Sequence, residues 1–554
     1  MNRNTELHFA ENPTNLDIQR SKFVREMTHK TTFNTGDLIP IYVDDALPGD
    51  TIQMDMASCI RMSTPIYPVM DNAYIDTYFF SVPERLVWQH WKEFMGENTT
   101  SKWEQEVEYQ MPQIKAPAGG WAKGTIADYM GVPTKVENLS IRADYFRAYA
   151  LIWNEWFRDQ NLKDPAHINL DDATVTGSNG STYQTDAQLG GMPLKAAKYA
   201  DYFTTALPQP QKGPDVLLPL GGNAPVIGNG ISIGLIDSKG NLGGMGGGLK
   251  DVQKLNAYTE RYGVEVTNGI YDAQSTGLNG NVGLTTDGTK SGMVADLSMA
   301  GAATVNQLRQ AFAVQRWYEK AARGGTRYTE TILAHFGVTS PDSRMQRPEY
   351  LGGKRWRVNM DQVLQTSSTS TVSPQGNTAA YSLTCDNSSL FTHSCTEHCI
   401  IMGLMVVRTD HTYQQGLARK FSRKSIFDFY WPTFANLGEQ AILNKEIYAQ
   451  GTAADDEVFG YQEAWAEYRY SPSRVSGAFR SNYAQPLDAW HYADYYTKQP
   501  ILSSDWIDET RANINRTIAV QDELEDQFIG DILFKAEWTR PMPIYSIPGL
   551  IDHH

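Results

Sequence analysis

Runs of β-type sequence stand at both ends of the chain, and a long section of different character separates them. From Thr31 to Val82, short stretches rich in β-branched and aromatic residues are bounded by Gly, Pro, Asn or Asp, as is typical of strands joined by turns. The same texture returns in residues 354–368, 393–408, 464–477 and 528–543. Two separate terminal domains would explain this arrangement, but one antiparallel β domain with greatly expanded loops is the more economical interpretation. We therefore predict that strands before about residue 83 pair with strands after about residue 350.

This interpretation divides the chain into three regions. Residues 1–83 form an N-terminal arm and the first strands, residues 84–349 form long helical and loop insertions, and residues 350–554 supply the remaining strands and interface loops. Within the insertions, three stretches carry large apolar residues at helical spacing, and the first and third also have terminating glycines. We predict helices there, over residues 83–97, 142–160 and 303–325.

One part of the insertions has an unusual composition. Residues 221–300 hold 18 of the 45 glycines of the chain, and aromatic residues are almost absent. A segment with so few large apolar side chains cannot build much of a core. We predict that about residues 215–300 form a surface protrusion, and the alternative is a flexible surface linker without a partner.

The bulk composition limits the class of protein. A chain of 554 residues, 41% of them apolar, can bury a large core, while a net charge of −15 argues against a protein that coats nucleic acid with its whole surface. No apolar run approaches the twenty or so residues that a membrane-spanning helix needs. The N-terminus lacks the apolar stretch of a secretory signal, so we expect no secretory precursor. Four cysteines are too few for a disulfide framework, which fits assembly in a reducing cytosol.

The stretch "HSCTEHCIIMGLMVVR", residues 393–408, resembles a zinc site because His393, Cys395, His398 and Cys399 lie within seven residues. On a strand, however, Cys395 and Cys399 would stand roughly 13 Å apart, at about 3.3 Å per residue, so the four ligands cannot converge. A helix would bring the two cysteines together, but the paired β-branched residues and the central Gly favour a strand. We predict a buried core strand with Cys395 and Cys399 on one face, and we expect all four cysteines of the chain to be reduced and free of metal.

Two stretches resemble catalytic or phosphate-binding motifs, but the residues around them do not fit the structure that each motif requires. "GISIG" surrounds Ser232 as in a nucleophile elbow, but the glycine-rich residues after it cannot form the required helix. "GGMGGGLKD" lacks the Gly-Lys-Ser/Thr ending of a phosphate-binding loop. We therefore expect no catalytic, cofactor-binding or metal-binding residues and no enzyme. The alternative in this class is a carbohydrate-active enzyme on a β-sandwich, which would need a carboxylate pair that no pattern marks.

Four segments together resemble one known family. They are residues 306–353, which include "ARGGTRYTE" and "QRPEYLGG", residues 412–448, which include "FYWPTFANLGEQAILNKEIY", residues 207–214 and the N-terminal "SKFVREMTHKTTFNTGDLIPIYVDDALPGDT". The chain is similar to the major capsid proteins of the gokushoviruses, small single-stranded-DNA bacteriophages of the microvirus family. The resemblance runs from about residue 17 to the C-terminus and weakens in residues 215–300.

The resemblance implies a mainly β fold, a single eight-stranded antiparallel jelly roll of the viral capsid type with long, partly helical loops. It implies sixty copies in a T=1 icosahedral shell around a circular genome, assembled in the cytoplasm of the host bacterium and located in the virion. The implied partners are further copies of the chain, single-stranded DNA, a small basic DNA-binding protein, an internal scaffolding protein, a DNA pilot protein and a host receptor. The resemblance also implies that residues 215–300 form part of a protrusion at the three-fold axes, and we expect this protrusion to serve host attachment. The alternative is an attachment or decoration protein on a shell made by another chain.

A shell protein needs positive charge toward its genome and apolar area toward its neighbours. Two basic clusters are candidates for DNA contact, with Phe421 able to stack on a base. Their members are Arg20, Lys22, Arg25 and Lys30, and Arg419, Lys420, Arg423 and Lys424. A solvated face or a salt bridge between subunits would explain each cluster equally well. Candidate subunit contacts are Tyr430, Trp431, Trp490 and Tyr492, for which ordinary packing within one subunit is the alternative.

Overall fold

The computed structural model describes residues 19–99, 101–102, 107–216, 226–228, 234–237, 242–244, 282–284, 293–295, 305–371 and 374–546. The chain divides into two compact units. The smaller unit comprises Gly213–Tyr318, and the larger unit comprises Met1–Lys212 together with Glu319–His554. Both main sheets belong to the larger unit.

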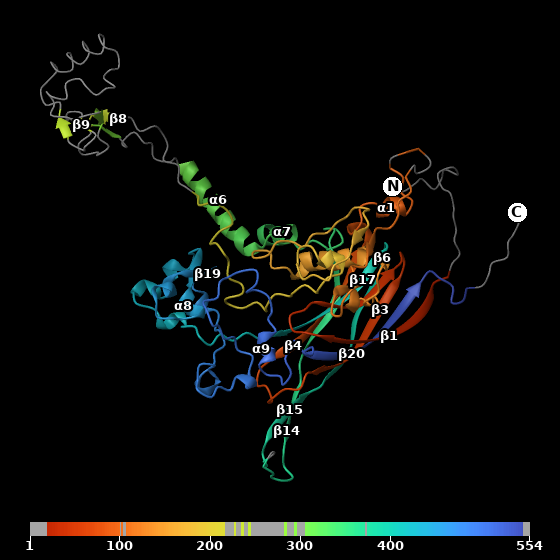
Figure 1. The fold of residues 1–554 in the computed structure, drawn as a ribbon. Helices are drawn as coiled ribbons and strands as arrows, with labels where there is room; N and C mark the ends of the chain where they lie inside the picture. The colour runs from red at the N-terminus through yellow and green to blue at the C-terminus, as the bar shows by residue number, and fades with distance from the viewer. Residues whose placement is uncertain are drawn as a thin grey trace. The chain divides into compact units, whose positions relative to one another are not determined.

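The larger unit contains two four-stranded antiparallel sheets, each built from both ends of the chain (Figure 1). The first sheet has the strand order β1-β20-β3-β16, with the bounds Ser21–Phe33, Phe528–Arg540, Thr51–Met62 and Thr384–Ser394. The second has the order β13-β4-β17-β2, with the bounds Glu349–Arg357, Ala73–Pro83, Cys399–Thr409 and Ile39–Ala46. The predicted pairing of early with late strands is therefore confirmed.

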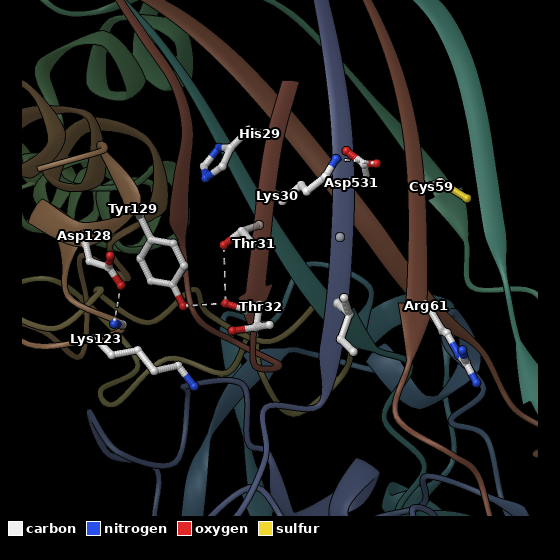
Figure 2. A pocket seen from close by; sticks show the side chains of 13 residues that line it. His29, Lys30, Thr31, Thr32, Cys59, Arg61, Lys123, Asp128, Tyr129 and Asp531 are labelled. Carbon is white, nitrogen blue, oxygen red and sulfur yellow. Dashed lines mark hydrogen bonds and ion pairs between the residues drawn. The ribbon is translucent and has the colours of Figure 1, made fainter. Parts of the chain in front are cut away.

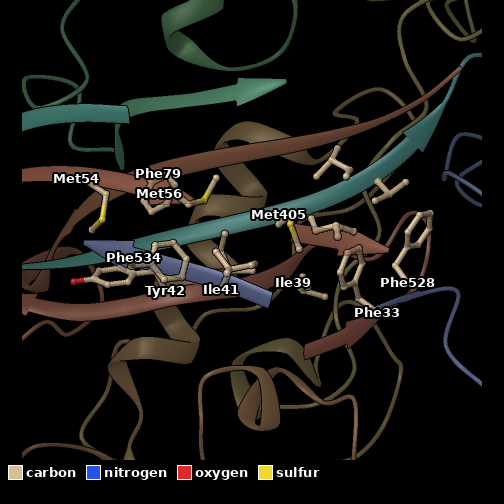
Figure 3. Close-up of a cluster of buried hydrophobic side chains, with 14 of the residues drawn as sticks. Phe33, Ile39, Ile41, Tyr42, Met54, Met56, Phe79, Met405, Phe528 and Phe534 are labelled. Atoms are coloured by element: carbon tan, nitrogen blue, oxygen red, sulfur yellow. The ribbon is translucent and has the colours of Figure 1, made fainter. Parts of the chain in front are cut away.

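The main core lies between these two sheets. Side chains alternate between the two faces of a strand, and β20 accordingly alternates buried with exposed residues along most of its length. Figure 3 shows Phe33, Met54 and Phe534 of the first sheet gathered with Tyr42 and Met405 of the second. Burial of each such side chain contributes about 1.5–3 kcal/mol, so this cluster holds the sandwich together.

The other face of the second sheet is covered by the insertions. Residues of α3 (Asp144–Ile152) and the following π-helical turn (Trp153–Phe157) form a second apolar cluster with outward-facing residues of β4 and β17. β17 is consequently buried on both faces, which explains its unbroken apolar sequence.

The predicted helices are only partly correct. The stretch 83–97 forms two short turns, Glu84–Leu86 and α1 (Trp91–Phe94), and the helix expected over 142–160 is α3 with its π-helical turn. The third helix is confirmed as α6 (Val305–Gly324), and α7 (Tyr328–Phe336) follows it. The strand expected in 464–477 is wrong, because Trp465 adopts a left-handed conformation (φ 67°) and a 3-10 turn, Ala466–Tyr468, follows.

Short elements complete the described part of the larger unit. β14 and β15 form a hairpin, β18 and β19 pair beside the short helix α8, and three short strands, β5 to β7, form a small sheet. The bounds are β5 Gln113–Lys115, α2 Ile126–Tyr129, β6 Ser140–Arg142, β7 Val175–Thr176, β14 Met360–Leu364, β15 Thr378–Ser382, β18 Glu439–Leu443, α8 Asn444–Ile447, β19 Val458–Glu463 and α9 Ala512–Asn515. No helix among the described residues has both the length and the apolar character needed to span a membrane.

The glycine-rich segment lies largely outside the described residues, so the predicted protrusion at 215–300 stays a prediction. Its described parts are five short strands in two antiparallel groups, β8 with β12 and β9 with β10 and β11. They have the bounds Val226–Gly228, Gly234–Asp237, Leu242–Gly244, Val282–Leu284 and Met293–Ala295 for β8 to β12.

Candidate nucleic-acid and subunit-contact surfaces

The N-terminal basic cluster lies along β1, at the edge of the first sheet. Three of its cations form ion pairs within the subunit, and Arg20 instead donates to the Thr51 hydroxyl at 2.9 Å. The pairs are Lys22 with Glu537 (2.5 Å), Arg25 with Asp44 (2.5 Å) and Lys30 with Asp531 (3.0 Å). The three basic side chains are about half exposed or more, and exposed pairs of this kind are worth only about 0–1 kcal/mol. A phosphate group can therefore compete for these cations.

A cavity of about 460 Å³ opens beside this strand (Figure 2). Strands β1, β3 and β20 form one wall, and the segment 123–129 forms the other. Lys30, Arg61 and Lys123 bring three cations to it, and Lys123 is paired with Asp526 at 2.7 Å. Arg61 has no carboxylate ion-pair partner in the described part of the chain.

Tyr129 closes one side of this cavity. Its hydroxyl donates to the Thr32 carbonyl oxygen at 2.9 Å, which ties the segment 123–129 to β1. Burial, together with the nearby charges of Asp37 and Asp526, raises the pKa of Tyr129 above its ordinary value. The phenol therefore stays protonated and serves as a hydrogen-bond donor rather than as an anion.

The second basic cluster separates into two arginines paired with glutamates and two exposed lysines, of which Lys420 lies over the Phe421 ring at 5.1 Å. Arg419 lies 3.7 Å from Glu446, and Arg423 forms an ion pair with Glu467 at 3.1 Å and stacks over the Tyr468 ring. These two guanidinium groups therefore hold the segment 419–423 against the rest of the subunit. The Lys420 and Lys424 side chains are exposed and have no carboxylate ion-pair partner among the described residues.

The candidate subunit contacts differ in exposure. Tyr430 and Trp431 are exposed, and Trp490 is half-buried against Tyr67, with the two rings stacked at 5.0 Å. Tyr492 is only 1% exposed and packs in the main core, where its hydroxyl faces the Met62 sulfur. The Tyr492 side chain is covered by contacts within its own subunit. Ordinary packing inside one subunit, rather than contact with a neighbour, therefore explains this residue.

The cysteines depart from the prediction. Cys59 and Cys385 form a disulfide between the neighbouring strands β3 and β16, where they are direct partners in the register. The expectation that all cysteines are reduced is therefore wrong for this pair, because strand pairing brings together two residues 326 positions apart.

The other two cysteines are free and buried, but they do not share a strand. Cys395 lies in the turn after β16, where its amide donates to the Asp50 carbonyl oxygen at 2.8 Å, and β17 begins at Cys399. A hydrogen bond from the Cys395 thiol lowers the pKa of Cys399. In the described part of the chain, no three His, Cys, Asp or Glu side chains gather where they could hold a metal ion.

Sequence reasoning missed two buried charge networks. His411 contacts Asp494 at 2.9 Å and Glu509 at 3.1 Å, and Arg408 binds Asp76 at 2.5 Å. The residues of each network are far apart in sequence or lie in irregular segments, so no sequence spacing predicts that they are in contact. A buried charge requires a partner, however, and the arginine near the end of the apolar run of β17 was a usable signal.

The larger unit is a two-sheet antiparallel β-sandwich whose loops expose aromatic and basic side chains, an architecture consistent with a viral capsid protein. The sequence profile of the family described as Capsid protein (F protein) matches residues 11–550. Capsid protein VP1 of Bdellovibrio phage phiMH2K is 44% identical over 556 residues, which cover 99% of this chain and 98% of that protein. Capsid protein VP1 of Spiroplasma virus 4 is 44% identical, with 96% of each chain covered, and that of Chlamydia phage 1 is 40% identical, with 98% and 97% covered.

The chain therefore belongs to this family of phage capsid proteins, and the resemblance seen in its sequence is confirmed. It is a structural protein of the virion, not an enzyme.

Proposed function

We propose that copies of this capsid protein close into a T=1 icosahedral shell of sixty subunits around a circular single-stranded DNA genome. The match over nearly the whole chain to capsid proteins carries the proposal. The strand order supports a jelly roll as the shell-forming unit. Counted along the chain, the first sheet holds strands one, eight, three and six, and the second holds five, four, seven and two, the order that two Greek keys produce.

Sedimentation of the purified protein tests this proposal. Sixty chains of 62.1 kDa give a protein shell of about 3.7 MDa. The expected result is empty particles near that mass and heavier, faster-sedimenting particles that contain nuclease-resistant DNA. A protein that sediments only as a monomer or small oligomer, with its phage partners present, would contradict the proposal.

The basic strand β1 supports an inner-face role near the genome. Its lysines are exposed and held only by weak surface pairs, and the neighbouring cavity adds Arg61 and Lys123. Phosphates bind such cations without reading sequence. A small basic DNA-binding protein of the same phage shares the neutralisation of DNA, which allows this chain to remain acidic. The internal scaffolding protein and the DNA pilot protein are further partners in assembly.

Matched charge removals separate DNA contact from a structural salt bridge. Lys22→Gln with Lys30→Gln removes the cations, whereas Glu537→Gln with Asp531→Gln removes their partners and frees the lysines. We expect both variants to form particles, with less packaged DNA in the first variant only. An equal loss of particles in both variants, or an outer-surface position for β1, would contradict DNA contact.

A further inference from the structure

The loop between β17 and β18 exposes an apolar surface that one subunit leaves uncovered. We call residues 417–437 the aromatic loop. Its exposed large apolar side chains are Leu417, Phe421, Ile426, Phe427, Phe429, Tyr430, Trp431 and Leu437, and Phe421 is 68% exposed. An exposed cluster of this kind on a protein surface marks an interaction site.

The aromatic loop is held in a defined shape. The Trp431 indole donates to the Ile426 carbonyl oxygen at 2.9 Å, and the Phe427 and Phe434 rings pack edge to face at 6.2 Å. Arg423 anchors the loop through Glu467. A surface that is already ordered loses little conformational entropy on binding, which favours association.

The loop before β20 has the opposite charge and an apolar tip. Leu524 is 86% exposed and lies between Glu523 and Glu525, which are exposed and have no ion-pair partner among the described residues. The base of this acidic loop, residues 521–525, is fixed, because Asp522 pairs with Arg511 at 3.2 Å and Asp526 with Lys123 at 2.7 Å. A side chain as exposed as Leu524 has almost no cover in its own subunit.

We propose that the acidic loop of one subunit binds the aromatic loop of a second copy of this chain. Leu524 packs against Phe421, and the two carboxylates of the acidic loop face Lys420 and Lys424. The two surfaces differ, so the contact is head to tail, and repeated contacts of this kind close into a ring. The inference rests on the proposed shell function and names the partner surfaces within it.

Single-stranded DNA is the other candidate occupant of the aromatic loop. DNA uses flat aromatic faces and free cations. The aliphatic side chains of Ile426, Leu437 and Leu417 add nothing to base stacking, and the guanidinium groups of Arg419 and Arg423 are already matched by glutamates. The observations therefore favour a protein partner with an apolar, acidic surface.

Charge exchange within the full-length chain tests this contact, with the protein produced beside the other structural proteins of its phage. One variant carries Lys420→Glu and Lys424→Glu, a second carries Glu523→Lys and Glu525→Lys, and a third carries all four changes. Each pair alone opposes like charges, so we expect particle yield in sedimentation to fall by about tenfold or more, because every subunit repeats the defect. The third variant restores opposite charges and should recover particles.

Leu524→Asp supplies a variant that leaves the fold intact, because this side chain has almost no contacts within its subunit. We expect loss of particles with unchanged circular dichroism, whereas Leu524→Met should assemble normally. If the wild type forms particles and both double charge variants form them equally well, the proposed loop contact is wrong, while the shell function still stands. The same conclusion follows if the variant with all four changes does not regain particles. Normal particle numbers with reduced DNA in the lysine variant would assign the aromatic loop to DNA instead. A wild-type chain that forms no shell would overturn the proposed function itself.

Discussion

His411 is a charged residue held inside the subunit by two carboxylates. Its side chain is 1% exposed, Nδ1 lies 2.9 Å from Asp494 Oδ2 and Nε2 lies 3.1 Å from Glu509 Oε2. Although burial alone would lower the pKa of His411, the charges of Asp494 and Glu509 raise it to about 10. The imidazolium therefore joins the end of β17 to the segment 494–509 at neutral pH.

Replacing this histidine should destabilise the subunit strongly. In His411→Gln, two buried carboxylates lose their counter-charge, a change that costs about 3–5 kcal/mol in comparable buried pairs. Chemical unfolding measures the loss, and His393→Gln, a change at a half-buried histidine, is the matched control with little expected effect. Equal stability of the two variants would contradict the role given to the buried triad.

The same histidine makes stability depend on pH. Its pKa in the folded protein, about 10, lies above the ordinary value of 6.5. The folded state therefore binds a proton that the unfolded state releases between these values, so the contribution of His411 to stability is complete below pH 6.5 and declines as the pH rises to about 10. Unfolding measured across this range should show the decline in the wild type and a smaller one in His411→Gln.

Among the elements, β17 is covered by apolar side chains on both of its faces. Gly403 lies at its centre, and a Cβ there would stand 2.5 Å from a carbon of the Phe79 ring. The ring occupies the space that any side chain would need.

Gly403→Ala should therefore destabilise the sandwich by about 1–3 kcal/mol through overpacking. Gly530→Ala in β20 is the control, because the nearest atom to its Cβ would be a Phe33 ring carbon at 3.3 Å, which a small shift relieves. Thermal unfolding of the two variants measures the difference. A larger loss in Gly530→Ala would show that the packing over β17 is looser than described.

The strand pair β3–β16 should carry a covalent link. Peptide mapping without reductant should recover Cys59 joined to Cys385, whereas Cys395 and Cys399 should react with an alkylating agent once the protein is unfolded. Loss of a native disulfide typically costs about 2–5 kcal/mol, so reduction should also lower the unfolding temperature. Complete alkylation of Cys59 before reduction would restore the original prediction of four free thiols.

Most of the sandwich could be predicted from local patterns, because alternation and turn residues report directly on strands such as β20. The turn at Cys395 could not, since no Gly or Pro marks it in the sequence and it is held by backbone hydrogen bonds to Gly49 and Asp50. The basic clusters could be found in the sequence by their composition. Which of their side chains are neutralised could not, because the ion-pair partners, such as Glu446 for Arg419 and Glu467 for Arg423, are distant in sequence.

At the scale of the whole molecule, both main sheets are complete within the larger unit. None of their strands uses a residue of Gly213–Tyr318. The stability of the sandwich should therefore be independent of the glycine-rich segment.

Deletion of about residues 225–295 should leave particle formation intact and reduce attachment to the host. We propose that three copies of this segment support one another in a protrusion that binds a receptor. Sedimentation measures the particles, and binding of labelled particles to host cells measures attachment. Unchanged attachment, or lost assembly with folded sheets, would contradict a receptor-binding role.

Image reconstruction of purified particles would show directly whether this chain builds the shell. We expect a closed icosahedral shell of sixty identical chains, each with the two-sheet sandwich, and single-stranded DNA inside filled particles. An open assembly, a different copy number, or a shell wall made by another chain with this protein only attached to it would contradict the proposed function.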